Sequence, residues 1–130
     1  VSQKGSNITA ERLRFDFSYP QKLTDTEIKK VEKLVNEVVE KNLPVSFEEK
    51  NLDEALAEGA LAFFGERYAG KVKIYTIGPS TRDARSGLAP FSREVCGGPH
   101  VAQTSEVGRV RIVKQEKLGT GVVRIYATAE

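Results

Sequence analysis

The residues with the clearest chemical capacity are Cys96 and His100, the only cysteine and the only histidine among the 130 residues. They lie four positions apart, separated by Gly97, Gly98 and Pro99. Two glycines and a proline favour a tight turn over a helix, because glycine tolerates many backbone conformations and proline interrupts helical hydrogen bonding. A thiolate and an imidazole on such a turn are two of the four ligands of a tetrahedral zinc site.

The spacing of this pair leaves three uses open. A free cysteine often serves as a small apolar core residue, and the histidine beside it is then incidental. A zinc site would need further ligands, which within this chain are Asp, Glu or water, since no other Cys or His is present. A nucleophilic Cys–His dyad would need a third group to orient the imidazole. The spacing alone favours the structural use.

The composition is that of a globular protein, with 39% hydrophobic and 29% charged residues. The length predicts a single domain over residues 1–130. One cysteine excludes an internal disulfide framework and fits a reducing, cytoplasmic setting. We expect no membrane segment, because no apolar run approaches spanning length. The chain begins at Val1 and contains no methionine, so we expect a segment of a longer protein.

Charge is unevenly distributed along the chain, although the net charge is only +2. Residues 25–60 carry ten acidic and five basic residues, whereas residues 61–130 carry eleven basic and six acidic residues. This asymmetry is compatible with a nucleic-acid partner and equally with a solvated surface. The arginines of the basic half are Arg67, Arg82, Arg85, Arg93, Arg109, Arg111 and Arg124.

Hydrophobic periodicity predicts an α+β fold, in which helices pack on one face of a mainly antiparallel sheet to make two layers. Thr24 and Glu27 form a capping-box pattern that opens a helix ending near Asn42, and Asn51 opens a second helix. Strands are expected at 13–19, 44–48, 71–77, 107–114 and 121–128, the last two as a hairpin. We also expect a turn at 5–6, a helical turn at 60–64 and a loop at 80–90.

Several blocks in order along the chain resemble the editing domain of alanyl-tRNA synthetases. Related domains occur in threonyl-tRNA synthetases and in free-standing alanyl-tRNA editing proteins. The block Arg-Leu-Arg-Phe-Asp-Phe-Ser favours the alanyl group. The similarity covers nearly the whole chain, in blocks at residues 1–6, 12–18, 65–68, 72–74, 92–101, 104–108 and 121–127.

The resemblance implies a zinc ion held by an upstream His-x-x-x-His pair and by a later Cys and His. Cys96 and His100 match the later pair, so two of the four ligands are present. The first pair would lie before Val1, and no residue from 1 to 130 replaces it. Whether this chain alone holds zinc is therefore open.

The implied activity is hydrolysis of the ester that joins a wrong amino acid, serine or glycine, to the acceptor end of alanine tRNA. By this resemblance Gln3 is the candidate catalytic residue, and Gly97, Gly98 and Arg93 are candidates for substrate binding. The rest of an ATP-dependent synthetase chain is the expected partner. The alternatives are a metal-free tRNA-binding or structural remnant and a free-standing trans-editing protein. Each of these residues also has an interpretation without a functional role. Gln3 and Arg93 could simply be solvated, and Gly97 and Gly98 could serve only the turn.

Overall fold

The structure, a computed structural model, describes residues 1–62, 71–79 and 90–130. The chain divides into two compact units. Unit 1 comprises Val1–Glu40 and Val107–Glu130, and unit 2 comprises Lys41–Glu106. Residues 80–89 of the loop expected at 80–90, and the end of the helical turn expected at 60–64, lie outside the described residues. Within the described residues, each unit combines antiparallel strands with an α-helix, so the predicted α+β class with mainly antiparallel pairing is confirmed.

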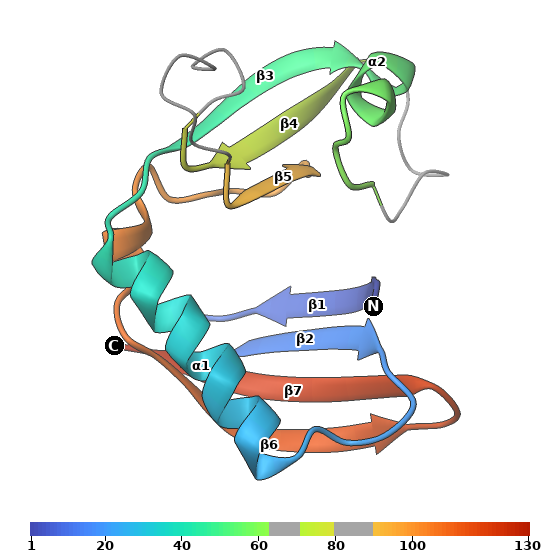
Figure 1. The fold of residues 1–130 in the computed structure, drawn as a ribbon, viewed down its shortest axis with the longest axis vertical. Helices are drawn as coiled ribbons and strands as arrows, with labels where there is room; N and C mark the ends of the chain where they lie inside the picture. Colours follow the sequence, from blue (N-terminus) through green and yellow to red (C-terminus); the bar gives the residue numbers. More distant parts are fainter. Residues whose placement is uncertain (63–70, 80–89) are drawn as a thin grey trace. The chain divides into compact units, whose positions relative to one another are not determined.

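Unit 1 is a four-stranded antiparallel sheet in the order β1-β2-β7-β6, with one long helix (Figure 1). Its elements are β1 (Gln3–Ile8), β2 (Leu13–Ser18), α1 (Asp25–Glu40), β6 (Val110–Leu118) and β7 (Val122–Ala129). The strand predicted from Leu13, the long helix and the C-terminal hairpin are all confirmed. The hairpin turns through Gly119 and Gly121, whose positive φ angles of 55° and 78° favour glycine.

The turn expected at Gly5 and Ser6 is wrong, because both residues lie inside β1. The pairing of β1 with β2 is irregular between Gln3 and Gly5. A Cβ atom on Gly5 would lie only 3.2 Å from an Asp16 carboxylate oxygen. This glycine therefore allows a close approach between strands instead of a reversal of the chain.

The capping box predicted for α1 is present. The backbone N–H of Thr24 donates to Oε1 of Glu27 (3.0 Å), and the N–H of Glu27 donates to Oγ1 of Thr24 (3.1 Å). The hydroxyl of Tyr19 donates to the other Glu27 oxygen at 2.7 Å. These bonds, with the Thr24 backbone bond as the largest cause, lower the pKa of Glu27. They define where the helix begins and connect it to the end of β2.

Side chains of α1 bind the open edge of β6. The Asn36 amide accepts from the Val110 N–H (2.8 Å) and donates to the Val110 carbonyl (2.9 Å). The Ile112 N–H donates to Glu32 Oε2 at 3.0 Å. Because β6 is the last strand of its sheet, these backbone groups have no neighbouring strand to pair with. Side-chain hydrogen bonds thus add to the apolar stripe of α1 in fixing the helix on the sheet.

Asp16 is a buried carboxylate in the middle of the unit 1 sheet, with only 6% of its surface exposed. It lies directly opposite Arg124 on β7. Arg124 donates from Nε to Oδ1 (2.8 Å) and from Nη2 to Oδ2 (3.0 Å). This bidentate pair is the main cause of a lowered Asp16 pKa, and Arg14, 3.6 Å away, adds to it. The pairing compensates the cost of burying the charge.

Unit 2 is a three-stranded antiparallel sheet in the order β3-β4-β5 with a short helix on one face. Its described elements are β3 (Val45–Asn51), α2 (Leu52–Ala57), β4 (Lys71–Ile77) and β5 (Ser92–Val95), followed by the 3-10 helix Thr104–Val107, whose last residue belongs to unit 1. The predicted strands and the helix after Asn51 are confirmed. The sheet and α2 enclose a small core made of Ala55, Ala60, Val72, Ile74 and Val95.

The helical turn expected from Ala60 is wrong for the described residues 60–62. The N–H of Leu61 donates to the Arg93 carbonyl (3.1 Å), and the N–H of Val95 donates to the Leu61 carbonyl (2.8 Å). Extended pairing with β5 takes the place of a helix here. The described residues contain no helix that combines the length and the apolar character needed to cross a membrane.

We predict that Asp16→Asn destabilises unit 1 by about 2 kcal/mol at pH 7, because the Arg124 guanidinium loses its charged partner. The folded-state pKa of Asp16 lies below its ordinary value of 3.8. The stabilisation by the charged Asp16–Arg124 pair is therefore complete at pH values well above 3.8. It disappears as the pH falls through the folded-state pKa. Urea unfolding of both proteins from pH 7 to pH 2 should show the stability difference shrinking toward acid.

Glu37→Gln is the control, because Glu37 forms an exposed pair with Lys33 at 3.9 Å. It should change stability by less than about 0.5 kcal/mol at any of these pH values. An Asp16→Asn difference that does not depend on pH would contradict the assignment.

Candidate functional site

The Cys96–His100 segment leaves the end of β5 as an irregular turn, as predicted. The N–H of Cys96 donates to the Lys73 carbonyl of β4 at 3.1 Å. Beyond the turn, the Ala102 carbonyl accepts a hydrogen bond from the N–H of Val45 at 2.9 Å. The turn is therefore anchored at both ends to the sheet of unit 2. Cys96 is half-buried and His100 is exposed.

The imidazole of His100 is held in position by two contacts. Nδ1 lies 2.9 Å from the Gly98 carbonyl oxygen. The ring also stacks on Tyr75, with 3.5 Å between ring centres and an interplanar angle of 15°. The tautomer that carries its proton on Nδ1 donates this hydrogen bond and leaves the lone pair of Nε2 available. Histidines that bind metals are commonly oriented in this way, by a carbonyl that accepts from the other ring nitrogen.

Cys96 and His100 fit two positions of a zinc site, by donor type and by the orientation of the imidazole. Within the described part of the chain, no group of three or more Cys, His, Asp or Glu side chains gathers to hold a metal. The described residues therefore offer this pair no further ligand of these types.

Gly97 and Gly98 are not required by the backbone of the turn. Neither has a φ angle in the left-handed region. A Cβ on Gly97 would meet nothing within 4 Å, and one on Gly98 would meet only the Cys96 sulfur at 3.8 Å. A small side chain would fit at both positions within the chain. Neither the backbone angles nor the packing of the turn therefore explains why glycine stands at these two positions.

Arg93 lies on β5, three residues before Cys96, and its guanidinium is bound within unit 2. Nη2 donates to Glu58 Oε2 at 2.8 Å, and Nη1 donates to the Glu58 carbonyl at 3.3 Å. Lys50 donates to the same carboxylate at 2.6 Å. The Glu58 pKa is lowered, first by Lys50 and then by Arg93. Arg93 therefore connects β5 to the end of α2, and this bond competes with any contact to a substrate.

Gln3 begins β1 in unit 1, where it pairs with Phe17 and is half-buried. The structure thus brings Cys96, Gly97, Gly98 and His100 together on one turn of unit 2, with Arg93 on the strand that leads into it. Gln3 belongs to the other unit. The arginines at 67, 82 and 85 lie outside the described residues.

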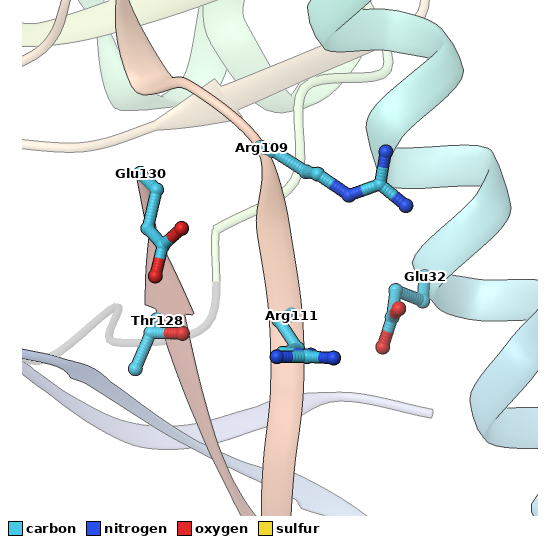
Figure 2. Close-up of a pocket in the computed structure, with 5 residues that line it drawn as sticks. All are labelled: Glu32, Arg109, Arg111, Thr128 and Glu130. Atoms are coloured by element: carbon cyan, nitrogen blue, oxygen red, sulfur yellow. The ribbon is translucent and has the colours of Figure 1, made fainter.

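A small surface pocket in unit 1 gathers charged residues that no predicted site included (Figure 2). Arg111 lines the pocket from β6, and Arg109 lines it from the position just before that strand. Glu32 approaches the pocket from α1. Neither guanidinium forms an ion pair with a described residue. Thr128 and Glu130 complete the lining. The only sequence signal was the alternation of two arginines along a strand. Since the lining carries two glutamates as well as two arginines, the pocket shows no clear preference for anions.

The comparisons with known proteins bear on the function of these residues. Residues 72–126 match the family described as the threonyl and alanyl tRNA synthetase second additional domain. The match begins in β4 and ends in β7, so it includes the Cys96–His100 turn. The resemblance to the editing-type domain of alanyl-tRNA synthetases is confirmed.

Individual alanine–tRNA ligases extend this similarity to the entire chain. The enzyme of Treponema denticola is 52% identical over all 130 residues. The enzymes of Borrelia hermsii and Sinorhizobium medicae are 51% and 45% identical over 127 residues, which are 98% of the chain. The chain spans only 20%, 20% and 14% of the lengths of these three relatives. It is thus similar to one segment of a much longer enzyme.

We predict that Arg93→Ala destabilises unit 2 by about 1–2 kcal/mol, because it removes two hydrogen bonds from a side chain that is 91% buried. Amide hydrogen exchange in β5 should accelerate accordingly. Arg111→Ala is the control, since Arg111 is exposed and unpaired among the described residues, and it should leave exchange in β5 unchanged. Equal effects of the two variants would show that Arg93 has no structural role.

Proposed function

We propose that this chain is the editing domain of an alanine–tRNA ligase and hydrolyses the ester that joins serine or glycine to alanine tRNA. The observation that carries the proposal is the similarity of the entire chain to one segment of alanine–tRNA ligases. The Cys96–His100 turn inside the matched family region supports it. The proposed partners are the tRNA acceptor end and the remaining ligase chain, in the cytoplasm.

Recognition energetics explains why such a ligase needs this second activity. A pocket that accepts alanine also admits glycine, which is smaller. It rejects the additional hydroxyl group of serine only modestly, because one small group changes binding by about 1–3 kcal/mol. A separate hydrolytic site removes the resulting errors after transfer to tRNA.

We propose zinc as the cofactor, with Cys96 and His100 as two of its ligands. The other ligands would come from outside the described residues. A bound zinc ion would supply Lewis-acid chemistry and a lower pKa for a coordinated water. His100 is suited to its part because the Gly98 carbonyl orients the ring through Nδ1 (2.9 Å).

Gly97 and Gly98 are proposed to make room for the substrate. Neither glycine is needed for the φ angle of the turn or for its packing. The absence of side chains would let the aminoacyl ester approach the backbone, where N–H groups can stabilise developing negative charge. Gln3 is proposed as a polar contact in the pocket. For Arg93, we propose that it positions β5 ahead of Cys96 and reaches a phosphate only when Glu58 releases it.

A second candidate function is a metal-free tRNA-binding or structural domain. The observation that favours it is the incomplete ligand set among the described residues. A third candidate is a free-standing protein that edits tRNA in trans. The presence or absence of an aminoacylation domain in the complete gene product would distinguish a ligase segment from such a protein.

We predict that Cys96→Ser lowers zinc content from about one ion per chain to near zero, because a hydroxyl is a far weaker zinc ligand than a thiolate. Hydrolysis of seryl-tRNA should fall by at least about tenfold. Metal analysis, the thiolate-to-cobalt absorption band of the cobalt-loaded protein, and a deacylation assay measure these effects. Both the 130-residue chain and the complete gene product should be tested.

Ser105→Ala serves as the control, because Ser105 lies in the same unit beyond the turn and bonds to Asn42. It should leave zinc content and deacylation at the wild-type level. A complete gene product that binds no zinc and spares seryl-tRNA after zinc addition would refute the hydrolase proposal in favour of the metal-free domain.

A further inference from the structure

The sheet of unit 2 has two different faces. Val72, Ile74 and Thr76 of β4 are buried on the face that carries α2. The alternate residues Lys73 and Tyr75 lie on the opposite face. Phe47 of β3 pairs with Tyr75 across the strands and is therefore on this same face. Its surface is 52% exposed, although phenylalanine is usually a core residue.

Three rings on this second face form a continuous row. The ring centres of Phe47 and Tyr75 are 5.4 Å apart, and those of Tyr75 and His100 are 3.5 Å apart. The ammonium group of Lys73 lies 5.1 Å from the centre of the Phe47 ring. The row thus runs from an ammonium group at one end to the Cys96–His100 turn at the other. We call Phe47, Tyr75 and His100 the ring row.

The ring row differs from the isolated apolar residues on the surface of unit 2. Leu56, Leu61 and Phe91 are also about half exposed, and scattered residues of this kind are ordinary. In the ring row, by contrast, flat rings lie in series beside a cation. Unpaired nucleobases stack on such rings, and a lysine beside them can neutralise a backbone phosphate. The chemistry of the face therefore fits single-stranded RNA.

We propose that the ring row is a stacking platform for an unpaired base of RNA, with Lys73 contacting an adjacent phosphate. The inference rests on the proposed function, which makes RNA the partner, and adds the residues that hold its unpaired part. Because His100 belongs to both the ring row and the turn, a stacked base lies beside the Cys96–His100 pair. The platform therefore positions RNA for that site.

The charges around the ring row indicate whether stacking or charge dominates the binding of RNA there. Glu49 lies opposite Lys73, and Glu94 lies opposite Tyr75, on the neighbouring strands. The two carboxylates on this face repel phosphate groups, so a series of phosphate contacts along it is disfavoured. Binding at the platform should therefore depend on base stacking more than on charge, with a shallow dependence on salt.

The test uses a short single-stranded RNA in which 2-aminopurine replaces one adenine, since stacking quenches its fluorescence. Titration with the complete gene product should give quenching, and Phe47→Ala should weaken binding by about 5- to 150-fold, because stacking contributes about 1–3 kcal/mol per base. Phe91→Ala is the matched control, since Phe91 has a similar exposure of 50% in the same unit. It should leave the titration unchanged.

A second pair of variants tests the phosphate contact. Lys73→Gln should reduce the slope of log affinity against log salt by about one, whereas Lys71→Gln, on the same face of the same strand, should not. Circular dichroism would confirm that each variant is folded. Equal effects within either pair, or no effect of Phe47→Ala, would overturn the platform.

The platform and the proposed hydrolase can fail separately. Phe47-dependent quenching without hydrolysis of seryl-tRNA would support the platform and refute the hydrolase. Hydrolysis whose KM is unaffected by Phe47→Ala, with unchanged quenching, would support the hydrolase and refute the platform.

Discussion

The carboxylate of Asp16 lies inside a sheet, and its burial requires the guanidinium of Arg124 on the neighbouring strand. The two oxygens bond to Nε and Nη2 at 2.8 and 3.0 Å. A shift of one residue in the pairing of β2 with β7 would separate the two charges and leave each without compensation. The ion pair thus specifies the register of the central strands. Gly5 belongs to the same arrangement, because a larger residue there would crowd the Asp16 carboxylate.

Unit 2 uses the two faces of its sheet for different purposes. One face packs Val72 and Ile74 against Ala55 of α2 and provides stability. The other face displays Phe47 and Tyr75, with His100 stacked on Tyr75. The Cys96–His100 turn gains its order from the sheet, through the bond from the Cys96 N–H to the Lys73 carbonyl. A site built on a turn of this kind inherits the rigidity of the strands below it.

Local sequence patterns predicted the elements whose signals are short in range. The alternation from Leu13, the Thr24–Glu27 capping box and the strand at 71–77 all appear as expected, since each pattern is complete within the segment's own residues. The predictions for Gly5 and Ala60 are wrong because the conformations of these residues depend on strands far away in sequence. Gly5 faces Asp16, and the residue after Ala60 pairs with β5. The same limit applies to Arg93, whose bond to Glu58 spans 35 residues.

By itself, the sequence determined the α+β class, the strands and helices with strong periodicity, and the resemblance to the alanyl-tRNA synthetase domain. Residue type and the resemblance also singled out Cys96 and His100 as candidate metal ligands, whereas their spacing alone favoured a structural use. Only the tertiary structure decided that the strands form two sheets, that Arg93 is bound within its unit, and that His100 stacks on Tyr75. Periodicity reports which face of a strand is apolar, but not which distant strand pairs with it. The partners of a charge or a ring are set by that pairing.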